Sequence, residues 1–154
     1  MSNIAVTSKK RSVQPYEYSI SLRFRHPSMD PTEISGALGI EPAHMWKAGA
    51  LRVTPAGATL GGTYPHSYWC TKICSLLASS NELLDAALVR LLDEFRVHKE
   101  LLLRMRREGG GAEFYVGVHG PASFGFEFTP ELLADLSRMG ITLSLEVLPV
   151  PQNS

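Results

Sequence analysis

The sequence predicts an α+β fold, a two-layer sandwich in which a mainly antiparallel, four-stranded sheet carries its helices on one face. Three observations lead to this prediction. Several segments alternate apolar and polar residues, one short helix pattern occurs twice, and the elements follow the order strand, helix, strand, helical linker, strand, helix, strand. Alternation with a period of two indicates strands that bury one side only, so we expect the helices to share one side of the sheet.

Three predicted strands show this alternation clearly. From Tyr18 to Phe24, apolar side chains alternate with serine and arginine, and the segments from Phe114 to His119 and from Ile141 to Val147 repeat the pattern. A fourth strand is expected from Tyr68 to Leu76, where both faces carry apolar side chains. The pattern therefore leaves open which side of this strand faces the core.

Two short helices have the same start and end signals. Each begins with an oxygen-bearing residue followed by proline, and each closes at glycine: Asp30-Pro31 with Gly39, and Thr129-Pro130 with Gly140. The first residue can cap free N–H groups, proline suits the first helical position, and glycine takes the left-handed conformation that ends a helix. Glu33 is also placed to complete a capping box with Asp30. The repeat suggests that one strand–helix unit is used twice.

The main helical region lies between Ser79 and Glu108. A capping box at Ser79 precedes a stripe of leucines that ends with Phe95. One unbroken helix here would be roughly 40 Å long, as large as the expected domain. We therefore expect a break near Arg96–His98, and a second short helix that stops at Gly109-Gly110-Gly111.

In this order, two βαβ units joined by a helical linker most resemble a ferredoxin-like sandwich. That fold places the first and third strands at the centre of the sheet. The face without helices would then present Arg23, Arg25, Tyr115 and His119. A bare sheet face needs an occupant, which is a partner subunit, the long loop or a ligand.

The long loop is the segment 41–66, which contains three prolines and four glycines. Loops of this length in compact domains are usually functional or disordered. We expect Pro42, Met45 and Trp46 to pack back on the sheet and residues 56–62 to form a mobile tip.

Length and charge limit the remaining possibilities. Residues 16–149 are expected to form a single α/β domain, between a flexible leader at 1–15 and a tail at 150–154. The 154 residues include 15 acidic and 15 basic side chains, which argues against a strongly basic nucleic-acid binder. No apolar run approaches the roughly 20 residues that span a membrane, and the leader lacks the core of a secretory signal. We expect a cytoplasmic protein with no nucleic-acid or membrane partner.

Three motifs resemble a known family. They are Leu38-Gly39-Ile40-Glu41-Pro42, then Trp46-Lys47-Ala48-Gly49, then an aromatic strand with Trp69, followed by a leucine-rich helix and a closing helix, glycine and strand. From Tyr16 to Val147 the chain resembles the small, mostly bacterial proteins grouped as domain of unknown function 4279 (DUF4279). The resemblance implies a compact α/β domain. It implies no activity, substrate or catalytic residue.

No catalytic or metal-binding pattern is persuasive. On a strand, His66, Cys70 and Cys74 would spread over roughly 27 Å and could not share one ion. The segment Phe124 to Phe128 lacks the basic and valine positions of aromatic RNA-binding motifs. The glycines at 109–111 follow a helix, which is the reverse of a phosphate-binding loop. We therefore expect no cofactor, no metal and no catalytic residue, and favour a binding role over an enzyme.

Two functions remain open. The first is a non-catalytic protein-interaction or regulatory domain that self-associates through the open sheet face and the Trp46 loop, since aromatics with arginine are the usual anchors of interfaces. The alternative is a small-molecule domain with a pocket between the 41–66 loop and the sheet. Its walls would be Trp46 and Tyr68, and Lys47, His66 or Arg23 would select an anionic group. The candidate binding residues are Arg23, Arg25, Trp46, Lys47, His66, Tyr68, Trp69, Tyr115 and His119.

Overall fold

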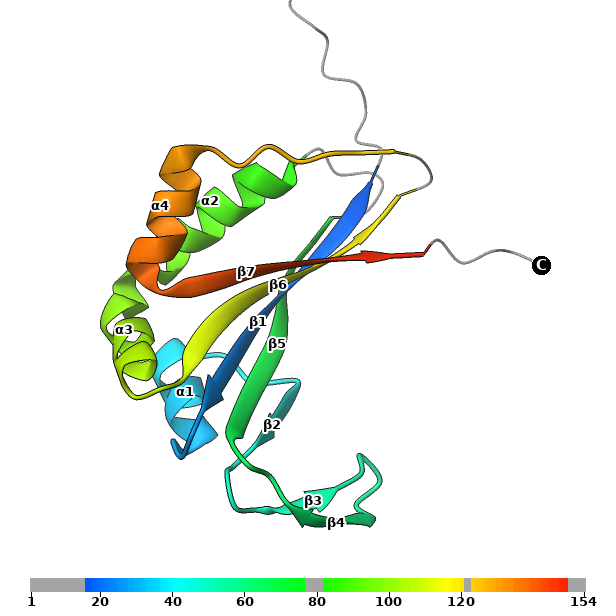
Figure 1. Cartoon of the computed structure of the whole chain (residues 1–154), viewed down its shortest axis with the longest axis vertical. Coiled ribbons are helices and arrows are strands. Elements are labelled where there is room, and N and C mark those ends of the chain that lie inside the picture. The colour runs from blue at the N-terminus through cyan, green and yellow to red at the C-terminus, as the bar shows by residue number, and fades with distance from the viewer. Residues whose placement is uncertain (1–15, 77–81, 121–122, 150–154) are drawn as a thin grey trace, which may run out of the picture.

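The computed structural model describes residues 16–76, 82–120 and 123–149. Its elements are β1 (Glu17–His26), α1 (Pro31–Leu38), β2 (His44–Trp46), β3 (Leu51–Val53), β4 (Thr59–Thr63), β5 (Ser67–Leu76), α2 (Leu84–Phe95), a 3₁₀ turn (Arg96–His98), α3 (Lys99–Arg107), β6 (Gly111–His119), α4 (Pro130–Met139) and β7 (Ile141–Leu148). A five-stranded sheet has the order β2-β5-β1-β6-β7, and β3 and β4 form a separate hairpin that projects from the end of the sheet (Figure 1). No helix in the described residues is long and apolar enough to cross a membrane.

β1 lies at the centre of the sheet because it pairs along both of its edges. It runs antiparallel to β5, from Tyr18 opposite Leu76 to His26 opposite Ser67. On its other side it runs antiparallel to β6, from Glu17 opposite His119 to Arg25 opposite Gly111. Every second residue of β1, from Tyr18 to Phe24, is buried, as the alternation of the sequence predicts.

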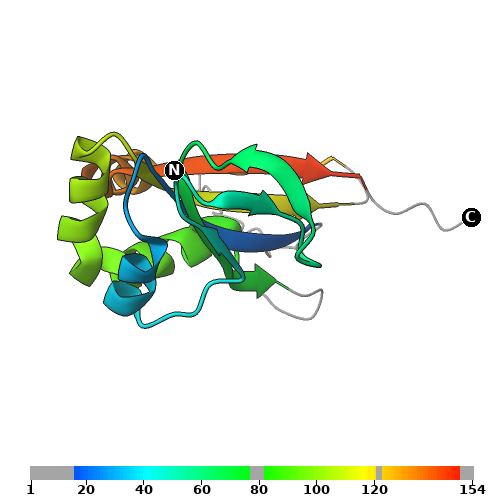
Figure 2. The same cartoon turned by 90° about the horizontal axis from the view of Figure 1, so that it is seen from below.

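The core lies between this sheet and the helices. Apolar residues of β1, β5, β6 and all the α-helices form one buried cluster, whose largest members include Trp69, Phe24, Phe114, Leu88 and Leu102. Figure 2 shows the helices gathered on one side of the strands. The alternate residues of the strands therefore face a side that no described helix covers.

The predicted ferredoxin-like sheet of four mainly antiparallel strands is wrong. In that fold the strand after the first helix would run parallel to β1, with another strand between them. Here the segment between α1 and β5 reverses the chain direction, so β5 pairs directly and antiparallel with β1. Among the described elements, only β6, α4 and β7 form a βαβ unit, with a parallel pair from Ala112 opposite Ile141 to His119 opposite Leu148. β2 adds a fifth strand, so the sheet is mixed and five-stranded.

The repeated start and end signals of α1 and α4 are confirmed. The side chains of Asp30 and Thr129 accept hydrogen bonds from backbone N–H groups of the first turn. Gly39 and Gly140 both have a φ of 66°, the left-handed conformation that ends a helix. The predicted capping box is absent, because the carboxylate of Glu33 pairs with Arg104 across 2.6 Å instead. The two units also end differently, since β7 starts directly after Gly140 whereas α1 is followed by the segment that carries β2 to β4.

The predicted break in the helical region is confirmed. α2 gives way to a 3₁₀ turn at Arg96–His98, and α3 then buries Leu102 and Met105 before it ends ahead of Gly109. The serine proposed as a cap, Ser79, lies outside the described residues, and α2 begins at Leu84 without a side-chain cap. The break lets α2 and α3 follow the curved sheet as two shorter helices (Figure 1).

The segment 41–66 is more ordered than a loop. It contains the short strand β2, which pairs with β5, and the hairpin of β3 and β4. Four of the residues expected in a mobile tip, Thr59 to Gly62, belong to β4. Trp46 packs back as predicted and is half-buried, whereas Met45 stays 45% exposed.

Candidate functional site

The candidate site is the sheet face opposite the helices, which we call the open face. The strand register builds it as three rows of side chains, because residues opposite one another in paired strands point to the same side. The rows are Trp46, Tyr68, Arg25 and Gly111; then His44, Cys70, Arg23, Glu113 and Thr142; then Lys72, Ser21, Tyr115 and Ser144.

Arg23 is held in place by two neighbours on β6. Its guanidinium carbon lies 3.5 Å from the centre of the Tyr115 ring. One of its nitrogens is 3.6 Å from the carboxylate of Glu113, directly opposite on β6. The cation–π contact and the ion pair fix the guanidinium group over the sheet, although about a third of the Arg23 side chain remains exposed.

Trp46 stands between two tyrosines. Its ring stacks on Tyr68 at 4.4 Å and on Tyr64 at 4.7 Å between ring centres. The guanidinium carbon of Arg25 lies 5.9 Å from the Tyr68 ring on the other side of that residue. Burial of the ring, and then the neighbouring Cys70, raise the pKa of Tyr68 to about 12. This aromatic stack fastens the 41–66 segment to the edge of the open face.

A hollow of about 240 Å³ opens on this face beside the two arginines. It is lined by Arg23, Arg25, residues 109–112, Glu113 and Thr142. Arg23 has Glu113 as its ion-pair partner, whereas Arg25 pairs with no carboxylate among the described residues. The hollow lies on the β6 side of β1, and the 41–66 segment does not line it. The alternative pocket predicted between that segment and the sheet therefore has a different position from the hollow observed.

The structure brings five of the sequence-predicted residues together on the open face: Arg23, Arg25, Trp46, Tyr68 and Tyr115. His119 shares their side of β6, but it is the last residue of that strand and lies roughly 13 Å from Tyr115. His66 precedes β5, is half-buried and makes no hydrogen bond or ion pair with a described residue.

Two other predicted residues lie away from the open face. Trp69 is fully buried in the core, where its Nε1–H donates to Ser35 Oγ at 2.9 Å and its ring meets the edge of Phe24. Lys47 points to α1, where its Nζ lies 3.6 Å from the capping carboxylate of Asp30. Trp69 points into the core because adjacent residues of a strand point to opposite faces, and its neighbour Tyr68 lies on the open face.

Sequence reasoning missed several residues of the open face, including His44, Cys70, Lys72 and Glu113. The predicted strand began at Phe114, whereas β6 begins at Gly111. Had the prediction begun at Gly111, alternation alone would have placed Glu113 on the open face. Cys70 shares its face with Tyr68 by alternation, whereas Cys74 needed the register, because an irregularity at Ile20 and Ser21 places it opposite the core residue Ile20. The free thiols consequently differ, with Cys70 opposite Arg23 and Cys74 packed against the core cluster.

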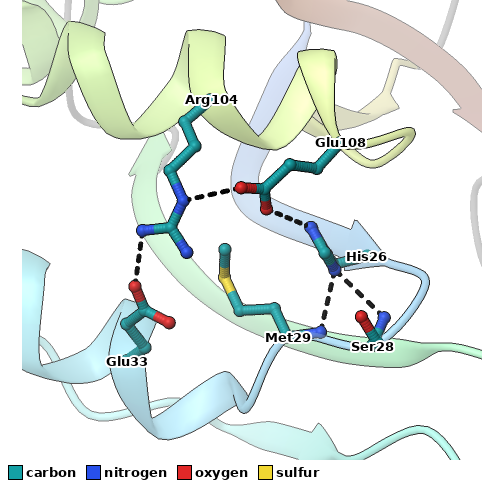
Figure 3. Close-up of polar contacts among 6 residues, drawn as sticks. All are labelled: His26, Ser28, Met29, Glu33, Arg104 and Glu108. Atoms are coloured by element: carbon teal, nitrogen blue, oxygen red, sulfur yellow. Dashed lines mark hydrogen bonds and ion pairs between the residues drawn. The ribbon is translucent and has the colours of Figure 1, made fainter.

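A second polar cluster, also missed, joins the end of β1 to α3 (Figure 3). His26 is only 6% exposed. Its Nδ1 accepts hydrogen bonds from the backbone N–H groups of Ser28 and Met29, at 3.0 Å and 2.8 Å, so its proton is on Nε2 and is donated to Glu108 at 2.8 Å. Arg104 then links Glu108 to Glu33 on α1. Both ring nitrogens of His26 are used within the fold, so the cluster ties β1, α1 and α3 together.

Metal ligation finds no support in the described ranges. Within residues 16–76, 82–120 and 123–149, no group of three or more His, Cys, Asp or Glu side chains is arranged to hold an ion. The open face offers hydrogen bonding, charge pairing, aromatic stacking and the thiol of Cys70.

Comparison with known proteins identifies the family. The model of the family described as Domain of unknown function (DUF4279) matches residues 16–149. The chain therefore belongs to that family. No curated protein matches the chain, and no solved structure matches it.

Proposed function

We propose that this member of the DUF4279 family is a non-catalytic protein-interaction module that self-associates through its open face. The observation that carries the proposal is a sheet face that no helix in the described residues covers. On this face Arg23 contacts Tyr115, and Tyr68 contacts both Arg25 and Trp46. Tyrosine, tryptophan and arginine are enriched at the energetic centres of protein interfaces.

Pre-organisation supports this proposal. A side chain that is already fixed loses less conformational entropy when a partner covers it, and such losses otherwise cost about 0.5–1.5 kcal/mol for each side chain. The face also carries both signs of charge, with Arg23 and Lys72 on the same side of the sheet as Glu113. A second copy can therefore supply a complementary charge for each.

The test is the mass of the native particle. Light scattering after size-exclusion chromatography is expected to give at least twice the chain mass of 16.9 kDa. Arg23→Glu and Tyr115→Ala are expected to lower the mass of the particle, whereas Arg107→Glu, on exposed α3 surface, is the matched control and is expected to leave that mass unchanged. A wild-type monomer at high concentration, or a dimer that these open-face variants do not change, contradicts the proposal.

We also propose a cytoplasmic location, which the free thiols of Cys70 and Cys74 fit, because reduced cysteines are the rule in that compartment.

A second candidate function is the binding of a small anion in the hollow beside Arg25. The observation that favours it is a guanidinium group that borders the hollow and has no carboxylate partner among the described residues. Carboxylates and phosphates are the groups that arginine recognises best.

Calorimetry with inorganic phosphate and with succinate tests this second function. Arg25→Gln is expected to weaken binding about tenfold or more, as expected for the loss of a charge-assisted hydrogen bond, and Arg107→Gln is expected to leave it unchanged. Absence of heat with both anions, or equal affinity in the two variants, removes this candidate.

A further inference from the structure

We propose that the outer edge of β7 is a second interface, at which β7 of a second copy adds antiparallel and joins the two five-stranded sheets into one. This inference concerns a sheet edge and backbone hydrogen bonds. It goes beyond the proposed function, which concerns side chains on the open face, and it uses different residues.

β7 has one paired edge and one free edge. Over its whole length it pairs with β6, from Ala112 opposite Ile141 to His119 opposite Leu148. It is the last strand in the sheet order, so no described strand pairs with its other edge. In Figure 2 β7, in orange-red, runs along one margin of the sheet. A free edge presents a row of N–H and C=O groups that can accept another strand.

The usual protection of a free edge is missing from β7. Natural edge strands are kept from pairing by shortness, proline, lysine or a bulge. β7 has eight residues, ITLSLEVL, with no proline, no basic residue and Glu146 as its one charge. The opposite edge of the sheet differs, because β2 has three residues. β7 also leaves two apolar side chains uncovered, Leu145 at 41% and Val147 at 65% exposure.

The sequence of β7 is complementary to itself, which is why we assign the edge to a second copy. Antiparallel pairing about a two-fold axis must place residues of the same face opposite one another. With the axis at Ser144, Leu143 faces Leu145 and Ile141 faces Val147, while Glu146 faces the hydroxyl of Thr142. With the axis at Leu145, Glu146 faces Ser144. In both registers apolar residues meet apolar residues, and the acidic side chain never meets its own copy.

The pairing also removes the exposed apolar surface. Leu145 and Val147 belong to the side of β7 that carries the buried Ile141. In the joined sheet they would pack against Leu143 and Ile141 of the second copy, on the helical side. One partner strand would therefore both pair the free backbone groups of β7 and cover its exposed apolar side chains.

A first experiment uses matched charge substitutions in the full chain. Val147→Lys places a cation at the proposed edge, and Val97→Lys places the same change at a side chain that is 82% exposed on the 3₁₀ turn. We expect Val147→Lys to raise the dissociation constant of the dimer about tenfold or more, and Val97→Lys to leave it unchanged, with circular dichroism as the check of folding.

A second experiment reads the register and does not depend on the stability of the lysine variant. In a chain with Cys70→Ser and Cys74→Ser, a cysteine at the two-fold axis lies opposite its own copy. Opposite Cα atoms in antiparallel strands are about 4.5–5.5 Å apart, which a disulfide can bridge. We expect Ser144→Cys or Leu145→Cys to give a covalent dimer on mild oxidation, and Ser137→Cys on α4 to stay monomeric on a reducing-agent-free gel.

The results separate this inference from the proposed function. Dissociation by Val147→Lys with no effect of Arg23→Glu supports the β7 edge and contradicts self-association through the open face. Dissociation by Arg23→Glu with no effect of Val147→Lys, together with no cross-link at position 144 or 145, overturns the β7 interface. A strict monomer for the wild type overturns both.

Discussion

His26 and Glu108 are joined by a 2.8 Å hydrogen bond between the end of β1 and the end of α3. The opposite ring nitrogen of His26 accepts from the backbone N–H groups of Ser28 and Met29. His26 is thus a buried polar residue that holds the turn between β1 and α1 by hydrogen bonds to its backbone.

His26→Ala is expected to lower the free energy of unfolding by about 2–4 kcal/mol, because it leaves the backbone N–H groups of Ser28 and of buried Met29 without their acceptor. Urea unfolding measures this loss. His44→Ala, at an exposed position on β2, is the control and is expected to change stability by less than about 0.5 kcal/mol. Equal effects of the two substitutions would show that the His26 contacts contribute nothing.

The stability of the fold is expected to depend on the charge of Glu108. Hydrogen bonds from Arg104 and then from His26 lower its pKa in the folded chain below the ordinary value of 4.5. The unfolded chain therefore takes up this proton first as the pH falls. The stabilisation is complete above the unfolded pKa and is lost as the pH falls through the folded pKa.

The measurement is the urea midpoint as a function of pH. Between about pH 5 and pH 3 the wild type is expected to lose stability more steeply than Glu108→Gln. Asp30 and Glu82, whose pKa values are also lowered, titrate in both proteins and cancel in the comparison. Exposed Glu41, which forms no ion pair with a described residue, supplies the control Glu41→Gln. Parallel curves for wild type and Glu108→Gln would refute this prediction.

Gly110→Ala is expected to destabilise the fold by at least about 2 kcal/mol. A Cβ at this position would lie 2.3 Å from the backbone carbonyl oxygen of Arg25, and backbone cannot move aside without disturbing β1. The neighbouring Gly111 has no atom within 4 Å of such a Cβ, so Gly111→Ala is expected to cost less than about 1 kcal/mol. Thermal unfolding of the two variants side by side decides the matter, and similar melting temperatures would contradict the close approach.

Trp46→Ala is expected to loosen the 41–66 segment while the core remains folded. Each aromatic pair contributes about 0.5–1.5 kcal/mol beyond its buried area, and Trp46 makes two. Limited trypsin digestion is expected to cut after Lys47 and Arg52 faster than in the wild type. Trp46→Phe keeps the stack in part and should be intermediate, and Leu60→Ala, at a 55% exposed position, should behave as the wild type. Unchanged cleavage in Trp46→Ala would show that the stack does not fasten the segment.

Local signals in the sequence predicted much of the secondary structure. The caps at Asp30 and Thr129, the break at Arg96–His98 and the alternation of β1 all depend on neighbours within a few residues, and the structure confirms each. The alternation of β1 also placed Arg23 and Arg25 together on one side, since residues two apart in a strand share a face.

The sequence by itself thus determined where α1 and α4 begin and end and which side of β1, β6 and β7 is apolar, because these properties are set by backbone and side chain within one turn or one pleat. Only the tertiary structure decided which strands are neighbours, since reversal of the chain between α1 and β5 gives β1 an antiparallel partner in place of a parallel one. The same long-range pairing brings Tyr68 and Trp46 beside Arg25 and leaves β7 at the margin of the sheet, because register is fixed by contacts between residues far apart in the chain.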